Sequence, residues 1–225
     1  MSNAQSVRIE IYSDTICPWC YIGKRRFERA LGERPGVEVE ITWMPFQLNP
    51  DMPSEGMHRQ SYLSSKFGGA QAAQSIYAPI VEAGHDERIE FNFDAMEKTP
   101  NTLDSHRLIH YAARQPEGQG AVVEALFLHY FESGEDIGDT DVLVECAVDA
   151  GLDGAQARAY LDSDEDRGKV ESQDVMARQM GIQGVPFFVF DGKYAVSGAQ
   201  PPEVIAGVFD TLAEEAAASP ETSLR

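Results

Sequence analysis

The sequence predicts an α/β fold in which a βαβ unit at the start of the chain and a ββα unit at its end enclose a large, all-helical insertion. Three observations support this: apolar residues alternate near both ends, they recur at helical spacing through the middle, and an Asp-Gly pair separates two short apolar runs late in the chain. With 225 residues and 43% hydrophobic composition, the chain can bury a sizeable core.

The βαβ unit is visible in the first residues. "VRIEIYSD" alternates apolar and polar residues, which predicts a strand with one face toward a core. From Pro18 the apolar residues follow helical spacing through "CYIGKRRFERAL", and "RPG" at 34–36 ends that helix. "VEVEITWMPF" alternates again, so a second strand should follow. Two strands joined through a helix pair in parallel.

The middle of the chain has a different pattern. Successive segments show helical periodicity, and most begin at Ser, Thr or Asp or end near Gly, as helix caps require. "VPFFVFDGKYAVSG" then predicts two strands around Asp191-Gly192, and "PPEVIAGVFDTLAEEAA" predicts a closing helix. We expect residues 1–50 and 181–225, with part of the helix before 181, to form one domain. Residues 51–180 should form the insertion.

Charge and hydropathy exclude several functions. A formal net charge of -19 should repel nucleic acid and anionic membranes, so neither is an expected partner. No apolar run approaches the roughly 20 residues that cross a bilayer, and the first residues lack the sections of a signal peptide. We therefore expect a cytoplasmic protein. The acidity fits either a salt-rich cytoplasm or an ordinary acidic protein.

"SDTICPWCYIG" contains the chemically informative pair, Cys17 and Cys20. Cys17 falls at the predicted junction of strand and helix, with Pro18 in the first turn. Unpaired amides and the positive end of the helix dipole favour a thiolate there, so Cys17 is the expected attacking sulfur. Cys20 shares the apolar helix face of Phe27 and Leu31, which suits a resolving sulfur beneath it.

Metal binding and an inert thiol pair are the alternatives for these cysteines. A structural zinc site usually needs four ligands, and C-x-x-C supplies two. The third cysteine of the chain, Cys146, recurs with Leu143 and Ala150 on an apolar helix stripe and is expected in the core. His106 and His110 lie four apart on a helix of ordinary packing pattern. We therefore expect redox chemistry and no metal site.

"YSDTICPWCYIG", "TPNTLDSHRLIHYA", "GVPFFVF" and "VSGAQPPE" together resemble the DsbA-like branch of the thioredoxin superfamily, and most closely its FrnE subgroup of dithiol oxidoreductases. The resemblance implies a thioredoxin fold and disulfide exchange with client proteins or small thiols. It also implies that Val185-Pro186 is a cis peptide against the cysteines, whereas the residues alone favour an ordinary strand-start proline. Pro186 lacks an N–H, and the main chain of Val185 can pair with an extended substrate.

The chain departs from DsbA at Trp19, which stands where DsbA has a histidine. An indole carries no charge, so we expect a dithiol less oxidising than DsbA's roughly -120 mV and nearer thioredoxin's roughly -270 mV. Trp19 could contact substrates or cover local core. In a reducing cytoplasm, reduction or isomerisation of client disulfides is more plausible than bulk disulfide formation.

Other chemistry remains open at this stage. Related 2-hydroxychromene-2-carboxylate isomerases and kappa-class glutathione transferases bind glutathione and place serine at the position of Cys17. Glutathione is thus a possible co-substrate, with the final helix near Ser197 to Gln200 as the candidate binding segment or simply a capped helix start. A thiol-independent chaperone, or holdase, with an apolar cleft is the alternative from another class. Oligomeric state is not predicted.

Weaker candidates complete the site prediction. Asn101 and His106 match the subgroup's insertion motif and could face the active site, or could lie on a polar helix surface. Asp14 could accept a proton or terminate the first strand. The basic side chains of the first helix are expected to form a solvated face: Lys24, Arg25, Arg26 and Arg29.

Overall fold

The computed structural model describes residues 6–218, so residues 1–5 and 219–225 of the predicted first domain lie outside the described range. Its centre is a four-stranded sheet in the order β2-β1-β5-β6. β1 pairs in parallel with β2 and antiparallel with β5, and β6 pairs antiparallel with β5. The strands are β1 (Val7–Ser13), β2 (Val39–Pro45), β5 (Phe187–Phe190) and β6 (Tyr194–Ser197).

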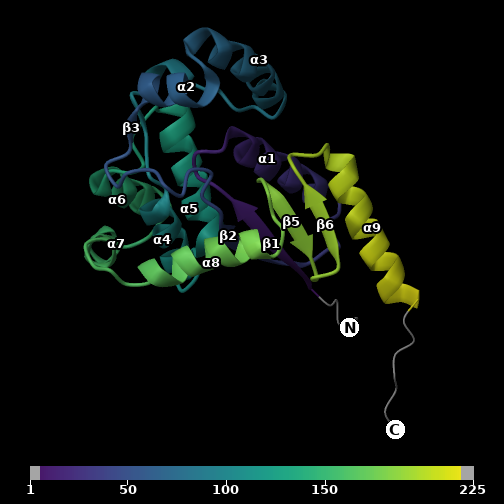
Figure 1. Ribbon diagram of the computed structural model, residues 1–225. Helices are drawn as coiled ribbons and strands as arrows, with labels where there is room; N and C mark the ends of the chain where they lie inside the picture. Colours follow the sequence, from purple (N-terminus) through teal and green to yellow (C-terminus); the bar gives the residue numbers. More distant parts are fainter. Residues whose placement is uncertain (1–5, 219–225) are drawn as a thin grey trace.

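Helices cover both faces of this sheet (Figure 1). On one face, Phe27 of α1 (Pro18–Gly32) stacks on Phe188, and Phe209 of α9 (Pro202–Ala218) meets Phe190 edge-on. On the other face, Tyr12 packs with Ala177 of α8 (Arg167–Gln179). The sequence of β1 alternates because Ile9 and Ile11 face the core while Arg8 and Glu10 are exposed, and only Tyr12 at the end of the strand reaches the second core. The predicted βαβ and ββα units are confirmed.

The Asp-Gly pair forms the hairpin between β5 and β6. Asp191 and Gly192 have φ angles of 50° and 67°, and the N–H of Lys193 donates to the carbonyl of Phe190 at 2.9 Å. Two successive residues of positive φ make a type I′ turn, whose twist matches the twist of the flanking strands.

Between β2 and β5 lies the helical region, residues 51–180. Its elements are α2 (Arg59–Phe67), α3 (Ala70–Asp86), α4 (Leu103–Ala112), α5 (Gly118–Phe127), α6 (Thr140–Asp149), α7 (Gly154–Leu161) and α8, with a 3₁₀ turn η1 (Phe93–Ala95) and a π turn η2 (Leu128–Glu132). One detail differs from the all-helical prediction: β3 (Met57–His58) and β4 (Lys98–Thr99) form a two-stranded ladder. Two-residue strands are too short to show any periodicity.

The apolar core is continuous between the helical region and the sheet region, which comprises residues 6–50 and 181–218. Ile9 and Phe188 of the sheet belong to the same buried cluster as Leu108 and Phe127 of the helical region. The predicted domains therefore share a core, and their boundaries at 50 and 180 stay a prediction. Across residues 6–218, no helix combines the length and apolar character needed to cross a membrane.

The expected solvated face of basic side chains on α1 is confirmed only for Arg29, which is exposed; Lys24 is buried, and Arg25 and Arg26 are partly buried. Lys24 is buried and bonds Glu124 of α5 at 2.6 Å. Arg25 also pairs with Glu124. Arg26 and Arg29 both pair with the buried carboxylate of Glu87, each at 2.9 Å. Because the helical region packs against this side of α1, the charges join the two regions.

Candidate active site at the start of helix α1

Cys17 lies at the junction between β1 and α1, as predicted. It is the N-cap residue of α1, with an extended backbone and Pro18 in the first turn. Its N–H donates to the carbonyl of Asp14 at 3.0 Å, which closes the turn that follows the strand. Its side chain is thereby placed at the start of α1, beside the unpaired amides of the first turn.

The Val185-Pro186 peptide lies against Cys17 and is cis, as the family resemblance implies. The Cys17 thiol donates to the carbonyl of Val185 with an Sγ to oxygen distance of 3.6 Å. Gly23 makes the approach of this loop possible: a Cβ at residue 23 would lie 2.7 Å from Cγ of Pro186. Gly23 was missed from the sequence, although an isolated glycine inside a helical pattern is a signal of close packing.

Cys20 lies beneath Cys17 on the inner side of the helix. Cys17 is 4% exposed and Cys20 is 1% exposed, and the two sulfurs are not bonded to each other. Burial, and then the neighbouring Cys17, raise the pKa of Cys20 well above its usual value, while Ser13 and the main chain of Asp14 offset part of this rise. Cys20 is less exposed than Cys17, as predicted. Cys17 is nevertheless buried, although an attacking sulfur was expected to be accessible to substrate.

Trp19 supplies the exposed apolar surface next to the cysteines. Trp19 is 36% exposed to solvent. An aromatic ring with an exposed edge can pack against a bound molecule. Between the two roles considered for Trp19, contact with substrates fits this exposure better than covering the core.

Buried polar side chains lie between the loop before Cys17 and helix α4. Asp14 is fully buried and accepts from the N–H of Leu48 at 2.6 Å through Oδ2. Its Oδ1 lies 3.4 Å from Nε2 of His106 on α4, although neither atom has a partner with hydrogen-bond geometry. Thr15 and Ser105 join their hydroxyls at 2.8 Å in the same interface. His106 is therefore buried against the loop before Cys17, and a polar helix surface is the wrong description of it.

Asn101 has a structural role in the same part of the helical region. Its Nδ2 donates to the carbonyl of Met52 at 2.6 Å, and its Oδ1 accepts from the N–H of Leu103 at 2.9 Å. Both ends of the carboxamide thus bond main chain, which ties the segment after β2 to the start of α4. Neither of these hydrogen bonds involves the cysteines, and the substrate role of Asn101 stays a prediction.

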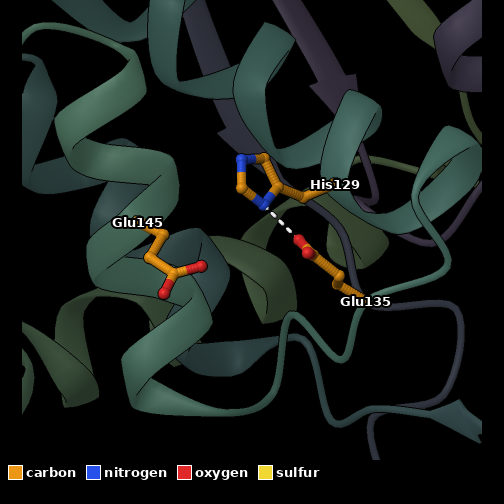
Figure 2. A group of neighbouring side chains, drawn as sticks. All are labelled: His129, Glu135 and Glu145. Atoms are coloured by element: carbon orange, nitrogen blue, oxygen red, sulfur yellow. Dashed lines mark hydrogen bonds and ion pairs between the residues drawn. The ribbon is translucent and has the colours of Figure 1, made fainter.

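Among residues 6–218, one group of side chains has the spacing of a metal site. Figure 2 shows His129 of η2 facing Glu135, with Glu145 of α6 nearby, and their ligand atoms lie within 4.8 Å of one another. Both imidazole nitrogens already have carboxylate partners, Glu135 and, at 2.9 Å, Asp149. Burial disfavours the charged ring, but these two carboxylates outweigh it and raise the pKa of His129. We therefore interpret His129 and its carboxylate partners as an ion-pair network and not as a metal site.

The model of the DSBA-like thioredoxin domain family matches residues 8–210. The chain belongs to this family. Its thioredoxin fold is thus established together with the strand and helix order described above. Within the DSBA-like family, the assignment to the FrnE subgroup stays a prediction.

Four known proteins resemble this chain, two of them in sequence and two in fold alone. The probable DsbA oxidoreductase SCO1869 from Streptomyces coelicolor is 33% identical, with a TM-score of 0.82 over 97% of this chain and 93% of that one. The uncharacterized protein YwbO of Bacillus subtilis is 29% identical over 88% of this chain and 94% of its own. A 2-hydroxychromene-2-carboxylate isomerase, 14% identical, shares the fold with a TM-score of 0.70 over 94% and 98%. The cytosolic disulfide reductase DsbM from Pseudomonas aeruginosa, solved with GSH, is 15% identical and shares it with a TM-score of 0.62 over 92% and 99%.

Proposed function

We propose that this protein is a dithiol-disulfide oxidoreductase that exchanges disulfides with client proteins or small thiols through Cys17 and Cys20. The observation that carries the proposal is the position of Cys17, which caps α1 with its sulfur 3.6 Å from the carbonyl of Val185. A reactive cysteine needs a setting that favours its thiolate and a surface that aligns the incoming sulfur. The helix start supports the first requirement and the Val185-Pro186 loop the second.

In the reducing direction, the Cys17 thiolate attacks one sulfur of the substrate disulfide. A Cys17-substrate disulfide forms, and the other substrate sulfur leaves as a thiolate that takes a proton from water. Cys20, after losing its proton, attacks Cys17, which releases the second substrate thiol and leaves a Cys17-Cys20 disulfide. The substrate gains two electrons and the protein loses two. A cellular thiol must then reduce the protein, and the oxidising direction uses the same steps in reverse.

The main chain of Val185 takes part in substrate alignment. An N–H of an extended substrate that bonds the Val185 carbonyl would replace the hydrogen bond donated by the Cys17 thiol. Substrate binding would then release that thiol for ionisation next to the disulfide to be attacked. Trp19, at 36% exposure, offers apolar contact on the way in. Ser13 and the main chain of Asp14 stabilise the thiolate of Cys20 during the second step.

Covalent trapping tests this proposal. In Cys20→Ser the resolving sulfur is missing, so mixed disulfides between Cys17 and clients should accumulate and disappear on reduction. Cys17→Ser/Cys20→Ser should trap nothing, and Cys146→Ser, a buried core change, should behave as the parent. Adducts are counted by non-reducing electrophoresis and mass spectrometry. A Cys20→Ser protein that forms no adducts and a parent that fails to reduce insulin would contradict the proposal.

Glutathione is the second candidate partner, favoured by the shared fold with DsbM, which was solved with GSH. The segment before α9 lies next to the Val185-Pro186 loop, because the N–H of Gly198 donates to the carbonyl of Pro186 at 2.8 Å. Calorimetry with Cys17→Ser separates the cases: saturable heat indicates a glutathione site, and its absence indicates that clients react directly. A cytoplasmic location is proposed with it, in line with the cytosolic DsbM.

A holdase remains the alternative from another class. Suppression of aggregation that survives in Cys17→Ser/Cys20→Ser, together with negligible insulin reduction by the parent, would favour it over the oxidoreductase. Suppression that vanishes with the sulfurs would support thiol exchange.

A further inference from the structure

A cavity of about 800 Å³ is lined by residues of α2, α3 and the segment 91–96. In Figure 1, α2 and α3 lie on the side of α1 away from the sheet. This volume is in the range of small-molecule sites. None of the residues that line it belongs to residues 17–20 or 185–186, so it is separate from the candidate active site. Its apolar lining residues include Leu63, Tyr77, Val81, Phe91, Phe93 and Met96.

Arg59 of α2 lines this cavity and is the unusual residue in it. It is 7% exposed, and its guanidinium donates to the hydroxyls of Thr99 at 3.1 Å and Tyr77 at 2.6 Å. Both partners are neutral. Within the described part of the chain, no carboxylate comes within 4.0 Å of Arg59. A buried cation without an anion is unfavourable, because neutral donors and acceptors replace only part of its hydration.

Among residues 6–218, the other buried Lys and Arg side chains have carboxylate partners. Lys24 pairs with Glu124 at 2.6 Å, and Arg107, fully buried, pairs with Asp104 at 2.8 Å. Tyr130 is fully buried close to Arg59, and its hydroxyl is oriented toward Thr99, the same side chain that accepts from Arg59. Arg59 differs from Lys24 and Arg107 because its contacts are with hydroxyls and with the rings of Tyr62 and Tyr77, 5.9 and 5.4 Å from its guanidinium carbon, and include no carboxylate among residues 6–218.

The aromatic residues that line the cavity indicate what shape of ligand would fit it. Tyr77 and Phe93 stack with centroids 4.4 Å apart, and Phe91 stacks on Phe93 at 4.9 Å. These three rings are half-buried and line the cavity, and a flat apolar body packs well on such rings. Asp94, exposed at the lining, would repel any anion, and a dianion more strongly than a monoanion.

We propose that this cavity binds a small organic monoanion, a carboxylate carried on a flat aromatic or apolar body, with Arg59 holding the carboxylate. A planar guanidinium suits a carboxylate because it can donate two parallel hydrogen bonds. The rings of Tyr77, Phe91 and Phe93 hold the body. Binding does not involve the cysteines, so it stands or falls independently of disulfide exchange.

Calorimetry with 2-naphthoate and its uncharged counterpart 2-naphthamide tests the proposal on the full chain. We expect saturable binding of 2-naphthoate and at least tenfold weaker binding of 2-naphthamide. Arg59→Gln should weaken 2-naphthoate at least tenfold, whereas Arg114→Gln, an exposed arginine beside Tyr111 and Tyr160, should leave it unchanged. Cys17→Ser/Cys20→Ser should bind like the parent.

A second variant covers the case in which Arg59→Gln does not fold. Ala78 lines the cavity from an exposed position on α3, so the indole of Ala78→Trp should occupy part of the space that the ligand body needs while Arg59 is left unchanged. This variant should abolish 2-naphthoate binding while keeping the parent's circular dichroism. No saturable binding to the parent, equal binding of acid and amide, or binding that survives Ala78→Trp would overturn the proposal.

Discussion

The sheet region and the helical region contribute to the cysteine site in different ways. The sheet region places the sulfurs through its main chain: the helix start carries Cys17, the Val185 carbonyl faces its sulfur, and Gly23 lets Pro186 approach α1. The helical region contributes side chains, with His106 against Asp14. It also holds α1 by ion pairs, of which the bond between Lys24 and Glu124 is one.

The sheet region thus determines the reactivity of the cysteines, and the helical region mainly stabilises the fold around them. Main-chain geometry at the end of a strand depends little on which side chains surround it, so the reacting group should tolerate changes in the helical region. Ion pairs and buried polar contacts depend on particular partners, so changes there should reduce stability before they reduce reactivity. The predictions below test this separation, from the largest expected effect to the smallest.

Cys17→Ser should produce the largest loss. Removing a nucleophile that acts together with its partner typically lowers turnover on the order of 10³-fold or more. Insulin reduction by a thiol-coupled assay should fall to background, while the melting temperature stays close to that of the parent. A Cys17→Ser variant with appreciable reductase activity would place the chemistry elsewhere.

Gly23→Ala should disturb the main-chain part of the site. The new Cβ would meet Pro186 at 2.7 Å, so the loop at Val185 must shift, with a loss of about 1 to 3 kcal/mol in the free energy of unfolding and slower disulfide exchange. Chemical denaturation and insulin reduction measure the two effects.

Gly32→Ala is the matched control at the end of the same helix. A Cβ at residue 32 has nothing within 4 Å, so this change should be neutral or stabilise by up to about 1 kcal/mol. Equal effects of the two substitutions would mean that helix propensity, and not contact with Pro186, decides the outcome.

Lys24→Met tests the support given by the helical region. Glu124 would lose one of its two cations but keep Arg25, so we expect the free energy of unfolding to fall by about 1 to 2 kcal/mol. Insulin reduction should change little. Lys193→Met, which removes an exposed pair with Glu215, should leave unfolding nearly unchanged. A Lys24→Met protein that is still folded but has lost most of its insulin reduction would show that the helical region affects reactivity as well as stability.

His129→Gln should have the smallest effect, and that effect should depend on pH. Glu135 and Asp149 raise the pKa of His129 in the folded protein, so its contribution is complete below the unfolded value of about 6.5 and disappears as pH rises through the folded pKa. We expect a loss below about 1 kcal/mol at pH 5.5, because solvent screens these pairs, and almost none at pH 9. His85→Gln, on an exposed turn of α3, should show no such trend in thermal melts.

Local patterns in the sequence determined the strands, the Asp191-Gly192 hairpin and the junction that carries Cys17, because strand alternation, turn residues and helix starts depend on neighbouring residues alone. Contacts between distant segments were decided by the tertiary structure. It brought His106 of α4 to Asp14, which lies 92 positions earlier in the numbering, and paired the basic residues of α1 with the helical region. It also left Arg59 buried among neutral groups. Periodicity shows which side of a helix is apolar but not which helix will cover a charge, since that depends on packing across the whole chain.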